Sequence, residues 1–129
     1  MIHKIFLQIG SLYALLGVIL GAFGAHALKE QLTPDRLASF ETGVRYQMYH
    51  ALALLVVALL FQYLDERLLR IVGWLFAIGV LLFSGSIYLL ACRDMIGLTS
   101  YKWLGPITPI GGTLLIIGWG LLLFASFKK

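Results

Sequence analysis

Residues 71–92 read IVGWLFAIGVLLFSGSIYLLAC, a run of 22 residues without a charged side chain. At a rise of about 1.5 Å per residue, a helix of this length crosses the hydrocarbon core of a bilayer, which is about 30 Å thick. Three further uncharged runs lie at residues 5–28, 46–64 and 103–127. They contain 24, 19 and 25 residues, so each is also long enough to cross. The sequence therefore predicts four transmembrane helices.

The composition agrees with a membrane protein. Hydrophobic residues make up 60% of the 129 residues and charged residues 12%, whereas soluble domains carry about 25% charged residues. Four spans use most of the chain, so we expect residues 1–129 to form one all-α domain, a bundle of four transmembrane helices. The expected spans are residues 5–28, 46–64, 71–91 and 107–127.

The basic balance of the chain points to lipid as a partner. The net charge is +4, but the lysines and arginines lie at the ends of the predicted spans. There they contact lipid headgroups and orient the protein. We therefore expect membrane lipids as partners and no nucleic acid. Cys92 is the only cysteine, so an intramolecular disulfide is excluded.

Four spans divide the ten lysine and arginine residues equally between the two membrane faces. On the side of both termini lie Lys4, Arg67, Arg70, Lys128 and Lys129; on the other side lie Lys29, Arg36, Arg45, Arg93 and Lys102. The cations on the terminal side occupy the shorter segments, where the positive-inside rule counts them most strongly. We therefore expect both termini in the cytoplasm.

Small residues follow one face of the first span. Gly10, Gly17, Gly21 and Gly24 recur at helical spacing, and Gly17 and Gly21 form a GxxxG pair. Glycines in this pattern let a neighbouring backbone approach closely. Two partners remain open: another helix of the same bundle, or the same helix of a second copy.

A helix start precedes the second span. Thr33 can cap free amides, Pro34 suits the first helical position, and Asp35 favours the positive end of the helix dipole. From residue 34 to residue 45 the pattern is amphipathic, and no Gly-Pro break precedes Leu64. We expect a short amphipathic helix that leads into span two, either as one long helix or with a bend.

Hydroxyl groups lie in the third and fourth spans. Ser84 and Ser86 flank a glycine in span three, where they can bond to an earlier turn or to a neighbouring helix. Packing and ligand contact are both open for them. In span four, Thr108 precedes Pro109 in the same way that Thr33 precedes Pro34. We expect Thr108 to cap a helix that begins at Pro109 and ends at residues 128–129.

Polar residues gather around the end of span one and the start of span two. His26 and His50 would approach each other at one membrane face if these spans pack as neighbours. The same stretch contains an acid and a base at ion-pair spacing and two hydrogen-bonding groups: Glu41, Arg45, Tyr46 and Gln47.

Three interpretations of this cluster are open. It is a hydrogen-bonded lock between the two spans, or a site for a lipid headgroup or a quinone ring. The third is a metal or bis-histidine haem site, for which two histidines without further ligands are weak evidence. We predict no metal and no cofactor.

The absence of certain side chains argues against two classes of function. None of the four uncharged runs contains an aspartate or glutamate, whereas exporters that exchange protons for drugs need a carboxylate within the membrane. No nucleophile with a base and an orienting group can be assembled, so we do not expect an enzyme.

Four sequence blocks resemble a known family. They are residues 21–28 (GAFGAHAL), 40–52 (FETGVRYQMYHAL), 84–88 (SGSIY) and 107–112 (ITPIGG). Together they resemble the signature of the small membrane proteins grouped as domain of unknown function 423, which is similar to animal transmembrane protein 256. The resemblance covers nearly the whole chain. It implies a four-pass protein of the bacterial inner membrane without an established activity. It also gives motif status to His26, Arg45, Tyr46, Gln47 and His50.

Two functional hypotheses follow. The first is a non-enzymatic structural or interaction protein that packs with itself, as a homo-oligomer, or with a larger membrane complex through the glycine face of span one. The second is a binding or permeation module for a small amphiphile, such as a lipid headgroup or a quinone, centred on the polar cluster.

Overall fold

The computed structural model describes residues 1–128, which form four α-helices. They are α1 (Lys4–Ala25), α2 (Pro34–Leu60), α3 (Glu66–Ala91) and α4 (Leu104–Phe127). All four are long and apolar enough to cross a membrane. The expected all-α fold with four transmembrane helices is confirmed. Lys129, one of the cations counted on the terminal side, lies outside the described residues.

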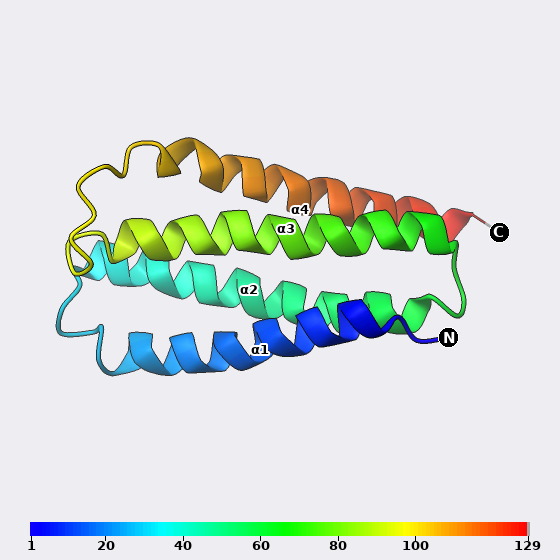
Figure 1. The fold of residues 1–129 in the computed structure, drawn as a ribbon, viewed down its shortest axis with the longest axis horizontal. Coiled ribbons are helices and arrows are strands. Elements are labelled where there is room, and N and C mark those ends of the chain that lie inside the picture. The colour runs from blue at the N-terminus through cyan, green and yellow to red at the C-terminus, as the bar shows by residue number, and fades with distance from the viewer. Residues whose placement is uncertain (129) are drawn as a thin grey trace.

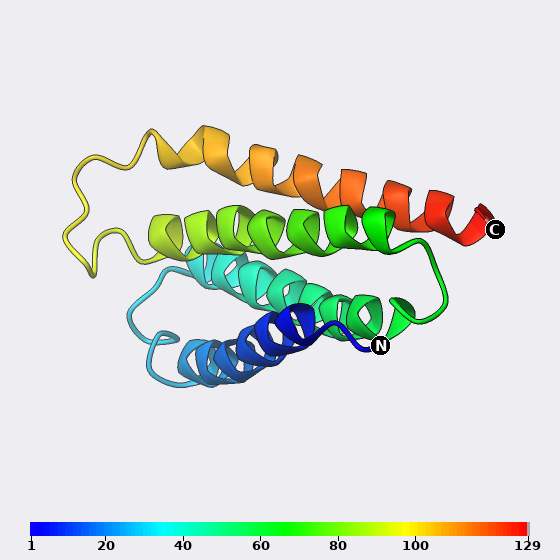
Figure 2. The ribbon, with the colours of Figure 1, turned by 45° about the vertical axis from the view of Figure 1, so that its right-hand side comes forward.

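The helices pack in the order of the sequence. α1 lies against α2, α2 against α3, and α3 against α4, with one small contact between α1 and α3. Figures 1 and 2 show the four antiparallel helices in a row, with both termini at the same end. Within residues 1–128, α1 and α4 do not contact each other. The bundle is therefore open, and α1 and α4 form its two edges. We call the end with the termini the terminal face and the opposite end the loop face.

α2 begins as the sequence predicts. The Thr33 hydroxyl accepts a hydrogen bond from the amide of Arg36 at 3.4 Å, and Pro34 occupies the first helical position. The amphipathic segment is the first part of this single helix, which continues without interruption to Leu60. Residues 61–64 form turns rather than helix. Consequently α2 is longer than a span needs at the loop face and ends earlier at the terminal face.

α4 begins earlier than expected, and the prediction that Thr108 caps it is wrong. The helix starts at Leu104, so Pro109 lies inside it and Pro106 lies in its first turn. Pro106 takes the place that the sequence argument gave to Pro109, because a residue of the first turn needs no amide hydrogen. Leu104 is buried, which anchors the earlier start. The Thr108 side chain bonds to α3 instead.

The glycine face of α1 packs against α2. A Cβ atom on Gly24 would lie 3.2 Å from the Phe40 ring, and one on Gly21 would lie 3.5 Å from Val44. Gly17 faces Met48 and Gln47, and a Cβ on Gly10 would lie 2.9 Å from the carbonyl oxygen of Ala51. The partner of this face is thus a helix of the same chain. A seam between two copies through these glycines would have to displace α2.

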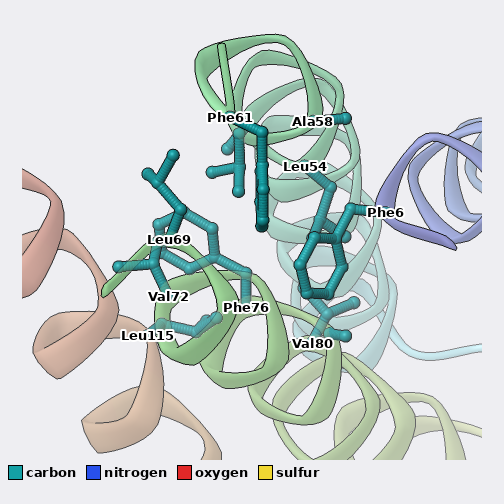
Figure 3. Packing of buried hydrophobic residues seen from close by; sticks show 12 residues of the cluster. Phe6, Leu54, Ala58, Phe61, Leu69, Val72, Phe76, Val80 and Leu115 are labelled. Carbon is teal, nitrogen blue, oxygen red and sulfur yellow. The ribbon is translucent and has the colours of Figure 1, made fainter. Parts of the chain in front are cut away.

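A cluster of apolar side chains fills the terminal half of the row. Figure 3 shows Phe6 of α1, Leu54 of α2 and Phe76 of α3 packed together, with Leu115 of α4 at the side. All except Leu115 are fully buried. At the junction of α3 and α4 a Cβ on Gly111 would lie 2.8 Å from the Cα of Phe83, so only glycine permits this backbone approach.

Ion pairs hold both ends of the row. At the loop face Arg36 pairs with Asp94, which joins the start of α2 to the segment after α3. At the terminal face Lys128 lies 2.8 Å from Asp65, which joins the end of α4 to the start of α3. In each case the hydrogen bond from the base lowers the pKa of the aspartate from its ordinary value.

Candidate functional site

Four polar side chains are buried between the helices. They are Gln47, His50, Ser84 and Ser86, and each has a hydrogen-bond partner within the chain. All four were candidates from the sequence. Since unsatisfied polar groups are costly in a bilayer, their partners determine whether they stabilise the fold or remain available to a ligand.

Gln47 joins three helices. Its amide nitrogen donates to the carbonyl oxygen of Tyr13 in α1 at 2.8 Å. Its amide oxygen accepts a hydrogen bond from the hydroxyl of Tyr88 in α3 at 2.6 Å. One turn earlier in α2, the carbonyl oxygen of Gly43 accepts from the Ser84 hydroxyl at 2.7 Å. The Tyr13 hydroxyl donates to the carbonyl of Ala77 at 2.7 Å. The result is a polar core that connects α1, α2 and α3, which we call the α1–α3 polar network.

His50 joins α2 to α4, whose backbones do not meet. Its Nε2 accepts a hydrogen bond from the indole N–H of Trp119 at 2.9 Å. An indole nitrogen only donates, so Nε2 carries no proton. The proton of the neutral imidazole is then on Nδ1, which donates to the carbonyl of Tyr46 at 2.7 Å. The ring of Phe76 supports the imidazole at 5.3 Å between centroids. This geometry holds His50 as a neutral structural link.

Sequence reasoning missed Trp119. Tryptophan is enriched at membrane interfaces, whereas Trp119 lies in the middle of an uncharged run. That unusual position is the signal that could have found it, because an indole N–H inside a bilayer needs an acceptor.

A pair of hydroxyl groups joins α3 to α4. The oxygens of Ser86 and Thr108 lie 2.6 Å apart, and Ser86 also donates to the carbonyl of Phe83 within its own helix. Both hydroxyls are therefore engaged in packing of these two helices.

His26 lies apart from His50, and the expected approach of the two imidazoles is wrong. His26 is exposed just after the last residue of α1, where Gly24 packs on Phe40. His50 lies ten residues further along α2, which corresponds to about 15 Å along the helix axis. The two histidines therefore cannot share a metal ion or a haem.

Glu41 and Arg45 are exposed on α2 and are not gathered around His50. Tyr46 is also exposed, but its carbonyl bonds to His50 and its ring stacks on the imidazole, with 6.3 Å between centroids. Arg45 donates to the Thr42 hydroxyl at 3.4 Å, and among residues 1–128 no ion pair joins it to Glu41. Glu41 and Arg45 border a hollow of about 250 Å³ that also includes Gly21 and Gly24.

A separate groove is lined by residues of α1, α2 and α3. It has a volume of about 200 Å³, and aliphatic side chains form most of its wall. Its polar members belong to the α1–α3 polar network: Tyr13, Gln47, Ser84 and Tyr88. Gly85 lines the same groove without a side chain. We call this hollow the lateral groove.

The fold and the polar core define a small integral membrane protein with four transmembrane helices. The chain belongs to the family of proteins of unknown function named DUF423, whose family model matches residues 20–112. The resemblance found in the sequence blocks is thereby confirmed.

Relatives match over nearly the full length. The UPF0382 membrane protein YwdK of Bacillus subtilis is 44% identical over 126 residues, which cover 97% of this chain and 98% of the relative. A UPF0382 membrane protein of Staphylococcus epidermidis is 43% identical over 125 residues, which cover 97% of both chains. These names place the relatives in membranes. No solved structure matches the chain.

We predict that replacing His50 by leucine lowers the stability of the protein in detergent by about 1 kcal/mol, because Trp119 loses its acceptor. Trp119→Phe should give a loss of similar size, and the double variant should lose no more than the larger single loss, since both changes remove one bond. Chemical denaturation of the purified protein measures these differences.

Tyr49→Phe is the matched control, because Tyr49 is exposed on the same helix and the change should have almost no effect. An unchanged or raised stability of His50→Leu would show that His50 is not a structural link.

Proposed function

We propose that this protein is a non-enzymatic component of the membrane that packs with itself or with a larger membrane complex. The observation that carries the proposal is the open row of helices. In a closed four-helix bundle each helix has two neighbours, whereas α1 and α4 each have one main neighbour here. The outer faces of these two edge helices are where a further helix would complete the packing.

The hydrogen bonds inside the row support a non-enzymatic role. The imidazole of His50 is held as a neutral link, and the Gln47 amide and the Ser84 hydroxyl bond to groups of the same chain. General acid–base or nucleophilic chemistry needs a side chain within reach of a substrate and a second group that activates it. Each polar side chain that is buried in the described residues already bonds to another group of the chain.

The interaction surface differs from the one that the sequence suggested. The glycines of α1 face α2, so the surface left for a partner is the opposite side of α1 together with the outer side of α4. Large aliphatic side chains cover both, among them Leu15, 59% exposed, and Ile116, 73% exposed. Helices in a bilayer associate through close packing, and shallow aliphatic faces of this kind suit a partner helix.

Site-directed crosslinking tests this role. In a Cys92→Ser chain, cysteines at Leu15 and Ile116 are labelled with a photoactivatable thiol reagent in native membranes. We expect adducts of discrete mass from either edge position. Leu52→Cys on α2 is the control, because Leu52 is more than half exposed, at 53%, but lies on an inner helix of the row. The same diffuse pattern from all three positions, or no adduct from either edge, would contradict the proposal.

A second candidate function is the binding of a small amphiphile with a ring, such as a quinone, in the lateral groove. The favouring observation is the juxtaposition in that groove of aliphatic walls with the Tyr88 hydroxyl and the Gln47 amide. Small-molecule sites combine mostly apolar walls with a few placed polar groups. Both polar groups retain capacity for one more hydrogen bond, because the amide has a second N–H and the hydroxyl oxygen still accepts.

Filling the lateral groove tests this second function. A Cβ on Gly85 meets nothing within 4 Å, and Gly85 lines the lateral groove, so we expect Gly85→Leu to place a side chain there. Gly120→Leu is the matched control, because Gly120 is equally open but lies on α4.

We expect the wild type and Gly120→Leu to co-purify with a ring-bearing amphiphile. Gly85→Leu should lose most of it at unchanged thermal stability. Mass spectrometry and an absorption spectrum of the extract measure the bound compound. Equal amounts in all three proteins, or none in the wild type, would exclude the groove as its site.

We also infer that the protein lies in a bacterial cell membrane with both termini in the cytoplasm. The bacterial relatives named as membrane proteins support the first part, and the short, cation-bearing segments of the terminal face support the second. A reporter that is active only in the cytoplasm, fused after Lys129, should be active. An inactive reporter in a stable fusion would reverse the orientation.

A further inference from the structure

Two opposite charges lie on α2 beside the last turns of α1. Gly21 packs against Val44 and Gly24 against Phe40, so the turn from Glu41 to Arg45 runs alongside residues 21–24 of the first helix. The first charged residue after α1 is Lys29. The backbone of Arg45 therefore lies at a depth where the neighbouring part of α1 carries no charge, and its guanidinium reaches back to the Thr42 hydroxyl.

The aromatic residues at the loop face indicate that the membrane interface lies at the level of Phe40 and Glu41 in α2. Trp103, 54% exposed, lines a hollow together with Tyr88, and the Tyr88 ring packs on Phe40 at 4.9 Å between centroids. Tryptophan and tyrosine gather where the apolar core meets the headgroups. Phe40 immediately precedes Glu41, which places the carboxylate of Glu41 near this interface and Arg45 one turn deeper.

These two charges are not neutralised by the rest of the described chain. Among residues 1–128 the ion pairs join Arg36 to Asp94 and Lys128 to Asp65, and neither involves Glu41 or Arg45. Arg45 contacts the Thr42 hydroxyl at 3.4 Å, which does not neutralise its charge. Charged side chains at membrane depth normally pair with an opposite charge. Both side chains are exposed towards the surroundings of α2, where that opposite charge has to be found.

We propose that Arg45 and Glu41 bind the headgroup of an aminophospholipid, with Arg45 on the phosphate and Glu41 on the primary ammonium group. In such a lipid the phosphate lies nearer the acyl chains and the ammonium group lies further towards water. Arg45 and Glu41 follow the same order, and their positions differ by about 6 Å along the helix. A guanidinium can hold a phosphate through two parallel hydrogen bonds, and a primary ammonium group has N–H donors for a carboxylate.

The shape of the surface supports this ligand. Glu41 and Arg45 border the hollow of about 250 Å³ whose other side is formed by Gly21 and Gly24. The two glycines have no side chains to fill it, and Phe40 and Val44 provide an apolar wall. A headgroup can thus lie against α1 while its acyl chains follow the apolar surface below.

The Glu41 carboxylate decides which phospholipid is preferred. A lipid with phosphate and a glycerol headgroup brings a net negative charge and no cation to Glu41. A choline headgroup has a cation, but its methylated nitrogen cannot donate a hydrogen bond to the carboxylate. This site is separate from the edge faces of α1 and α4 and from the lateral groove, so it goes beyond the functions proposed above.

Native mass spectrometry with defined lipids tests the site. The purified protein is loaded with phosphatidylethanolamine, phosphatidylglycerol and phosphatidylcholine of identical acyl chains, in equal amounts. We expect the wild type to retain phosphatidylethanolamine with a preference of roughly tenfold in dissociation constant over each of the others. Arg45→Gln should lose retention of phosphatidylethanolamine and phosphatidylglycerol alike. Glu41→Gln should keep binding but lose the preference between these two lipids.

Glu66→Gln and Arg67→Gln are matched controls, because this acid and this base lie at the start of α3 on the terminal face. Both should retain the wild-type preference. Equal retention of the three lipids by the wild type, or an unchanged preference in Glu41→Gln, would overturn the proposal. Displacement of the lipid by millimolar inorganic phosphate would overturn it as well, since it would identify a site for free phosphate.

Discussion

The missing side chain at Gly43 is the constraint on which the polar core of this protein depends. A Cβ at this position would lie 2.8 Å from the Tyr88 ring, so only glycine lets Tyr88 pass across α2. By passing there, the Tyr88 hydroxyl reaches Gln47, and the Ser84 hydroxyl reaches the Gly43 carbonyl itself. In a bilayer the hydrophobic effect does not hold helices together, so close packing and such hydrogen bonds must do so. Gly118 has the same role for His50, because a Cβ there would lie 2.7 Å from the Phe76 ring that supports the imidazole.

Most of the fold could be predicted from the sequence, because the bilayer imposes one dominant requirement. Every span must be a helix of sufficient length without charge, and uncharged runs are visible directly. The start of α4 could not be predicted in the same way. Pro106 and Pro109 give the same local signal for the start of a helix. The choice between them depends on burial of Leu104 and on the bond from Thr108 to Ser86, and both are tertiary contacts.

The sequence indicated which polar residues form the candidate site, but it did not indicate which partners they bond to. Gln47, His50, Ser84 and Ser86 stood out because polar groups in apolar runs need partners. Their partners were not visible, since Trp119 is 69 residues from His50 and α2 and α4 do not pack directly. The proposed closeness of His26 and His50 failed for a different reason. His26 follows the end of α1, which packs at Phe40, whereas His50 lies ten residues further along and near the middle of α2; this register between the two helices depends on tertiary packing.

Polar groups whose hydrogen bonds are all used within the chain stabilise the fold, and polar groups with unused capacity are open to a ligand. Inside the row, His50 uses both ring nitrogens, and Ser86 and Thr108 bond to each other, so these groups hold helices in place. Along α2, capacity remains where the helix is open to its surroundings: at the lateral groove and at Glu41 and Arg45. A ligand that enters from the bilayer gains most where a charge has no opposite partner within the chain, because a charge-assisted bond is roughly twice as strong as a neutral one. We therefore expect Glu41 and Arg45 to attract a charged headgroup more strongly than the buried polar core attracts a neutral group. The buried polar residues that stood out in the sequence stabilise the fold, whereas Glu41 and Arg45 lie on the exposed side of α2, where we propose that a lipid headgroup is recognised.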